Sequence, residues 1–254
     1  MKIVAAVVMT VLLTACVSSP LQSTQATHEG LVEFAGSQKR IFATGKAEQT
    51  VSVAAMSACP DAFGVGAVAG LDGEITVFQG RAYVTQVRGD HYTIEHGHEH
   101  GAVFAVWSCQ TKWRSEAVPD KVKGYLDLQD FVKARAAAAG IDVAKPFPFR
   151  LAGRPTEVKW HINVDLTGGK AIDSELFTKS KANYVARSQS MEIIGFYSEH
   201  HPGVFISAFA PAIPKESGVN NAIHIHMLTQ DGKAAGHIDN IALAPGMTLR
   251  LPQR

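Results

Sequence analysis

The stretch from Phe63 to Val87, FGVGAVAGLDGEITVFQGRAYVTQV, most constrains the fold, because glycines interrupt short runs of Val, Ile, Phe and Tyr. Branched and aromatic residues favour strands, and closely spaced glycines favour tight turns. The segments 102–109, 147–153 and 157–166 have the same strand character. The sequence therefore predicts a β-rich protein in which short strands alternate with turns.

One helix is expected, over residues 120–139. Its apolar residues recur at helical spacing, an alanine run follows them, and Gly140 is suited to end the helix. One face of this helix should be buried, formed by Val122, Tyr125, Leu126, Leu128, Phe131 and Val132.

Charge excludes one class of function. The chain has 24 Lys and Arg against 23 Asp and Glu, a formal net charge of +1, and no basic block. Proteins that bind nucleic acids carry a basic patch or stripe, so no nucleic-acid partner is expected.

The first residues indicate export. Lys2 precedes an apolar run that is too short to span a bilayer, and LTAC follows at residues 13–16. This tetrapeptide resembles the lipobox of bacterial lipoproteins, which implies that residues 1–15 are a signal peptide and that Cys16 is lipidated. Val17 favours the outer membrane, with the protein facing the periplasm, and residues 16–45 would form a tether. The alternative is an ordinary secretory peptide with an incidental cysteine.

The two remaining cysteines, Cys59 and Cys109, have two interpretations. In an oxidising compartment such thiols often form a disulfide. They can equally be two separate buried thiols that pack as small apolar groups, since the sequence does not give their distance.

Three histidines form a candidate metal site. On a strand, His224 and His226 share a face, and the turn QDGK can return the chain so that His237 lies beside them. Three neutral imidazoles suit Zn²⁺ and leave positions open for water or substrate. Taken alone, the pattern also fits plain surface histidines.

A second histidine group, His96, His98 and His100, lies in EHGHEH. It could capture a metal ion at the surface, or it could be a solvated hairpin tip. Arg150 also has two interpretations: it could be a structural ion-pair partner or a residue that lines a pocket.

Five segments in the same order resemble the bacterial acetolactate decarboxylase family. They are FGVGAVAGLDGE (63–74), VFAVW (103–107), FPFRLAG (147–153), IIGFYSEH (193–200) and HIHMLTQDGKAAGHI (224–238). The resemblance implies an α/β, β-rich fold with a mixed β-sheet domain at 46–145 and a barrel-like β domain at 146–254 that holds the metal. It also implies a homodimer formed through the sheet.

The resemblance assigns roles to particular residues. Its zinc ligands fall on His224, His226 and His237, and its proton-donating carboxyl group falls on Glu74. The family reaction removes carbon dioxide from 2-acetolactate to give acetoin, which implies a small keto-acid substrate.

The chain also departs from the family pattern. In VKWHIN, His161 stands where the family has an active-site Arg, and no acidic residue follows Asp239. The loop before the first histidine is longer, with residues 202–221 making up most of it. Two functions therefore stay open: a zinc-dependent decarboxylase in which His161 takes part of the Arg role, or a zinc-holding binding or structural lipoprotein without catalysis.

Overall fold

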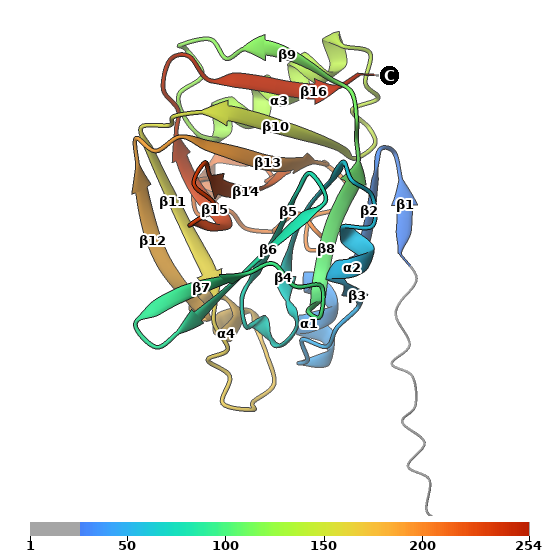
Figure 1. Ribbon diagram of the computed structural model, residues 1–254, viewed down its shortest axis with the longest axis vertical. Coiled ribbons are helices and arrows are strands. Elements are labelled where there is room, and N and C mark those ends of the chain that lie inside the picture. Colours follow the sequence, from blue (N-terminus) through green and yellow to red (C-terminus); the bar gives the residue numbers. More distant parts are fainter. Residues whose placement is uncertain (1–25, 254) are drawn as a thin grey trace, which may run out of the picture.

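Two eight-stranded sheets form the protein, and the computed structural model describes residues 26–253 of the chain (Figure 1). The named strand pairs within this part of the chain are antiparallel. The expected signal peptide and Cys16 lie outside the described residues. The β-rich fold expected from the sequence is confirmed.

The first sheet has the strand order β1-β2-β8-β4-β5-β6-β7, and β3 also pairs with β8. Its strands are β1 (Thr27–Glu29), β2 (Val32–Gly36), β3 (Val51–Ser52), β4 (Ala62–Val68), β5 (Glu74–Phe78), β6 (Arg81–Arg88), β7 (His91–Glu95) and β8 (Gly101–Cys109).

The second sheet has the order β12-β11-β15-β14-β13-β10-β16-β9 and does not close into a barrel, since β12 and β9 are its edges. Its strands are β9 (Trp113–Ala117), β10 (Phe147–Gly153), β11 (Glu157–Asn163), β12 (Lys181–Arg187), β13 (Met191–Tyr197), β14 (Ile223–Thr229), β15 (Ala235–Ala242) and β16 (Thr248–Pro252).

The expected helix is α3 (Tyr125–Ala138), which packs against the second sheet. Asp127 caps its start, because its carboxylate accepts hydrogen bonds from the backbone N–H groups of Lys123 and Gly124. Gly140 follows the helix at a φ of 77°, a conformation that glycine adopts without strain. The shorter helices are α1 (Gln38–Thr44), α2 (Val53–Met56), α4 (Ser174–Lys179) and the 3₁₀ turns η1 (Ala69–Leu71) and η2 (Lys215–Ser217).

Residues 26–45 differ from the expected tether, because β1, β2 and α1 lie there. Val32 and Ile41 are buried, so this segment contributes to the core. β9 and α3 precede residue 146 yet lie with the second sheet. The domain boundary at 145/146 stays a prediction.

The core lies in layers. One apolar cluster lies between the sheets, where Phe63 and Val106 of the first sheet meet Ile194 and Phe196 of the second. A larger cluster lies between α3 and the second sheet. Burial of this apolar surface holds the layers together. Within the described residues, no helix has the length and apolar character needed to cross a membrane.

Cys59 and Cys109 form a disulfide, with their Cα atoms 6.3 Å apart. Cys59 follows α2, and Cys109 ends β8 opposite Ala62 of β4. The disulfide ties the α2–β4 connection to the centre of the first sheet.

Candidate functional site

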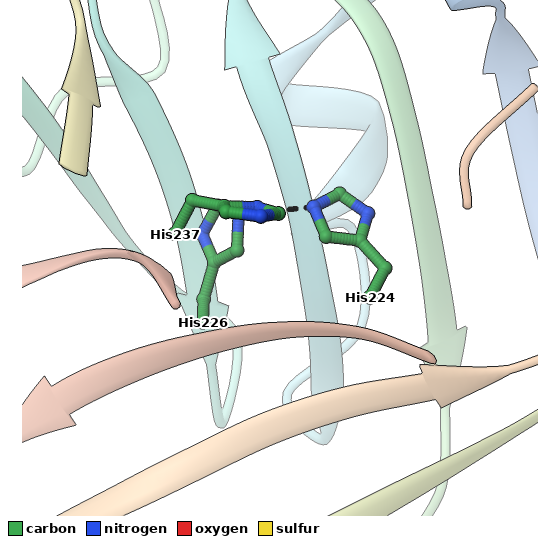
Figure 2. Close-up of side chains that lie close together, drawn as sticks. All are labelled: His224, His226 and His237. Atoms are coloured by element: carbon green, nitrogen blue, oxygen red, sulfur yellow. Dashed lines mark hydrogen bonds between the residues drawn. The ribbon is translucent and has the colours of Figure 1, made fainter. Parts of the chain in front are cut away.

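The three candidate ligands lie together between the sheets. His224 and His226 are on β14, and the turn after Thr229 brings β15 back so that His237 pairs directly with His226. Figure 2 shows the three rings turned toward one another, with a dashed line between His224 and His226. One ring nitrogen from each lies within 4.8 Å of the others.

His161 extends this row of histidines by one strand. It lies on β11 opposite His237 of β15, and the two ring centroids are 4.7 Å apart. The register between β11 and β15 shifts between Lys159 and Trp160, directly before this pair. Four imidazoles therefore converge from three neighbouring strands.

The first sheet supplies the residues that face the histidines. The hydroxyl group of Thr76, on β5, lies 3.0 Å from Nδ1 of His226. When Nδ1 donates its hydrogen to this hydroxyl group, the lone pair of the ring is on Nε2. Nε2 of His226 lies only 3.2 Å from Nε2 of His224.

These residues fit a divalent metal ion. Burial lowers the pKa of His224 to about 3 and lowers the pKa of His226 and of His237 well below its usual value, so the rings stay neutral. Neutral imidazoles coordinate first-row metals through a ring lone pair. Two Nε2 atoms at 3.2 Å, each available as a ligand atom, suit one shared cation.

Glu74 enters the site from the start of β5, and the preceding turn fixes its direction. Gly73 has a φ of 137°, and a Cβ atom added there would lie 2.4 Å from the carbonyl oxygen of Thr85. The side-chain amide of Gln86 donates to the carbonyl oxygen and carboxylate of Asp72, at 2.8 and 2.9 Å. The sequence LDGE therefore forms a turn that only glycine permits at residue 73.

Glu74 is 2 % exposed, and its carboxyl group faces two histidines. Its Oε2 lies 3.6 Å from Nε2 of His226, and its Oε1 lies 3.7 Å from Nε2 of His161. Oε1 has no hydrogen-bond partner among the described residues. Burial raises the pKa of Glu74 well above its usual value, and the charge of Lys181 offsets this only in part. A carboxyl group in this environment can hold a proton at neutral pH.

His161 is oriented by an acidic neighbour. Its Nδ1 lies 2.7 Å from Oδ2 of Asp239, and Nζ of Lys181 lies 3.5 Å from the other oxygen of the same carboxylate. Burial lowers the pKa of His161 and outweighs this hydrogen bond. Burial also acts to raise the pKa of Asp239, but His161 and Lys181 together hold it below its usual value. A neutral His161 therefore donates from Nδ1 to an ionised Asp239.

The long loop before β14 forms one wall of the site. A small cavity of about 30 Å³ lies over the histidines, and Phe205, Ser207, Phe209 and Pro211 of this loop line it. α3 anchors the end of the loop, because the hydroxyl group of Tyr125 donates to the side-chain oxygen of Asn221. This apolar wall limits the access of water to the metal-binding nitrogens.

The sequence had singled out five of these residues: Glu74, His161, His224, His226 and His237. The structure brings all five together. Sequence reasoning missed Thr76, Asp239 and Lys181 as part of the site. Thr76 and Lys181 lie in strands with no motif of their own, and Asp239, which directly follows the matched segment 224–238, was noted only as a departure from the family pattern. For Thr76 and Lys181 the only available signal was their alternation on strands adjoining the histidines.

Other candidates lie elsewhere. In the connection between β7 and β8, Nδ1 of His96 lies 2.9 Å from the carbonyl oxygen of Ala82, and His100 contacts Glu95 at 2.8 Å. Within the described residues, the groups placed to hold a metal ion draw on His161, His224, His226, His237 and Asp239 instead. Arg150 is a structural ion-pair partner, since its guanidinium donates to Glu192 at 2.8 Å.

Fold and site together define a two-sheet β protein with a buried three-histidine centre and an adjacent carboxyl group. The family model for alpha-acetolactate decarboxylase matches residues 34–251. The chain belongs to this family.

Solved structures share the fold. Alpha-acetolactate decarboxylase from Bacillus subtilis strain 168 is 15% identical, with a TM-score of 0.64 over 87% of this chain and 85% of that chain. A Staphylococcus aureus protein of unknown function, described as similar to alpha-acetolactate decarboxylase, is 14% identical, with a TM-score of 0.64 over 85% and 83% of the two chains. A search of curated proteins gave no match. The expected acetolactate decarboxylase fold is confirmed.

Proposed function

We propose that this protein is a zinc-dependent decarboxylase of acetolactate or a related 2-hydroxy-3-keto acid, with acetoin or an analogous hydroxyketone as product. Family membership supports a decarboxylase acting on a small keto acid. The observation that carries the proposal is the buried carboxyl group of Glu74, held within 4 Å of Nε2 of both His226 and His161.

His224, His226 and His237 would hold the metal. When bound, a divalent ion would act as a Lewis acid toward the ketone and hydroxyl oxygens of the substrate. By accepting a hydrogen bond from Nδ1, Thr76 would hold His226 in the tautomer whose Nε2 lone pair faces the site. The aromatic side chains Phe104, Phe205 and Phe209 line the cavity and limit the access of water.

Glu74 would supply the proton. Loss of carbon dioxide breaks a carbon–carbon bond and leaves its electron pair on the hydroxyl-bearing carbon, which must then be protonated. A carboxyl group whose pKa is raised by burial holds a proton at neutral pH and can donate it to that carbon. Nε2 of His161 lies 3.7 Å from Oε1 of Glu74 and would orient the protonated carboxyl group.

The alternative, a zinc-holding binding or structural lipoprotein, has less support. A structural zinc site is usually closed by four protein ligands, and three histidines leave a position open. Glu74 lies beside this open position. Its carboxyl group has no evident structural role, because its Oε1 makes no hydrogen bond with the described residues.

The test is an assay of the purified, zinc-loaded protein against acetolactate and a panel of 2-hydroxy-3-keto acids, with carbon dioxide and hydroxyketone measured together. Equal amounts of both products, dependent on zinc, are the expected result. Zinc-loaded protein that releases carbon dioxide from none of these acids would overturn the proposal.

We also propose that lipidated Cys16 anchors the protein to the outer membrane, facing the periplasm. LTAC at residues 13–16 supports this, and so does the disulfide between Cys59 and Cys109, which suits an oxidising compartment. The homodimer implied by the resemblance remains a prediction, and sedimentation velocity would test it.

A further inference from the structure

Lys181 lies where the inner cavity meets a larger chamber. It is the first residue of β12, and its side chain is 18% exposed. The inner cavity over the histidines measures about 30 Å³, and the outer chamber, walled by Trp160, Tyr184 and Val185, measures about 480 Å³. Lys181, Asp239 and Pro211 line both spaces. Lys181 therefore stands in the wall that the two spaces share.

Lys181 is also the only lysine or arginine among the described residues that line the inner cavity. Among residues 26–253 its one ion-pair partner is Asp239, at 3.5 Å, and the other oxygen of that carboxylate is occupied by His161. The ammonium group has three N–H donors, so donors remain for a further oxygen ligand.

His161 cannot supply a comparable donor in this arrangement. Its Nδ1 lies 2.7 Å from Oδ2 of Asp239, and its Nε2 faces Oε1 of Glu74 at 3.7 Å. Both ring nitrogens of His161 therefore face carboxyl groups of the protein itself, and β11 directs no cationic group at a carboxylate ligand.

We propose that Lys181, on the neighbouring strand β12, binds the carboxylate of the substrate and is a specificity-determining residue for carboxylate-bearing ligands. This inference rests on the proposed function, since it assigns a role within the same site. A charged N–H donor and a carboxylate form one of the stronger hydrogen bonds in proteins. The position of Lys181 at the junction places this contact beside the metal-binding histidines.

Two non-reacting probes of matched skeleton test the inference on the zinc-loaded protein. 2,3-Dihydroxy-2-methylbutanoate has the carboxylate, and butane-2,3-diol lacks it. Calorimetric titration at about 0.15 M salt should show that Lys181→Met weakens binding of the acid by about tenfold to a hundredfold. Binding of the diol should change by less than about twofold, and Lys181→Arg should restore most of the affinity for the acid.

Lys179→Met is the matched control, because Lys179 is exposed, lies two residues away and carries the same charge. It should leave binding of both probes unchanged. With acetolactate, Lys181→Met should raise KM by a larger factor than it lowers kcat. If Lys181→Met does not fold, Lys181→Gln replaces it with the same expected result.

Three outcomes would overturn the inference: equal affinity of the wild type and Lys181→Met for the acid, an equal loss in Lys179→Met, or failure of the wild type to bind the acid. Failure of the proposed function is distinguishable from these outcomes. Binding of the acid that depends on Lys181, without turnover of acetolactate, would sustain the inference and defeat the decarboxylase proposal. Turnover of acetolactate with an unchanged KM in Lys181→Met would defeat the inference and sustain the decarboxylase proposal.

Discussion

At the residue scale, the role of Glu74 depends on its burial between two histidines. Glu74→Gln keeps the shape of the side chain and removes the transferable proton, so we expect a loss of turnover of about a hundredfold or more. Zinc content should stay near one ion per chain. Product release from acetolactate and elemental analysis of the same sample are the measurements. Glu48→Gln, at an exposed glutamate, is the control and should retain full activity.

The metal site gives a second prediction at this scale. His226→Ala removes one of the three ligands and should abolish stoichiometric zinc binding, because two imidazoles bind far more weakly than three. Elemental analysis after dialysis is the measurement. His98→Ala, in the exposed connection between β7 and β8, should retain the metal. Full zinc occupancy in His226→Ala would show that the ion is bound elsewhere.

The candidate site could be predicted from the sequence only where the spacing of residues along the chain determines which side chains lie together. His-x-His on a strand places His224 and His226 on one face, and an Asp-Gly turn returns the chain to His237. Glu74 was identified through the family resemblance, since a glutamate after a turn is ordinarily a surface residue. Lys181 and Asp239 meet only because β12 and β15 flank β11, and no local pattern specifies that order.

At the scale of elements, the disulfide holds the connection from α2 to β4 against the end of β8. Because 50 residues separate the two cysteines, opening the bond should lower the free energy of unfolding by about 4 kcal/mol in the chain-entropy estimate. Denaturant titration with and without reductant measures this. The double variant Cys59→Ala with Cys109→Ala should show the same loss and no further response to reductant. Equal stability with and without reductant would contradict the estimate.

Arg150 connects the two sheets. It lies on β10 of the second sheet, its guanidinium is 4.7 Å from the ring centroids of both Phe63 and Phe78 in the first sheet, and it donates to Glu192. Arg150→Met should lower the free energy of unfolding by about 2 kcal/mol, because the hydrogen bond of the buried guanidinium to Glu192 is lost, while Glu192 keeps its ion pair with Arg250. Denaturant titration is the measurement.

Arg187→Met is the control for this change, because Arg187 forms an exposed ion pair on the edge strand β12. It should change stability by less than about 1 kcal/mol. An equal effect of the two substitutions would show that Arg150 does not stabilise the contact between the sheets.

Helix α3 and the strands 102–109, 147–153 and 157–163 were predictable, because periodicity and glycine placement are local signals. The order of strands in the second sheet was not predictable from the sequence. β16 pairs with β9 and β10, which precede it by roughly a hundred residues or more, and apolar strands of similar length carry little information about such partners. Burial of Val32 and Ile41, which orders residues 26–45, depends on the same long-range contacts.

At the scale of the whole molecule, the proposed anchor predicts where the protein is found in the cell. Cys16→Ser should release the protein from the membrane fraction or leave its signal peptide uncleaved, because acyl chains are attached to that cysteine. Fractionation and the intact mass of the mature protein are the measurements. Unchanged fractionation together with an unchanged mass would show that Cys16 is not lipidated.

The position of β16 in the second sheet has a consequence for the order of synthesis. β16 lies between β10 and β9, so both strands keep an unpaired edge until Thr248–Pro252 has been made. A chain made from its N-terminus can complete the first sheet early, whereas the second sheet waits for β16, the last strand of the described residues. Open edges invite pairing with other chains, so the interval before β16 is added is the period in which this protein is most exposed to aggregation.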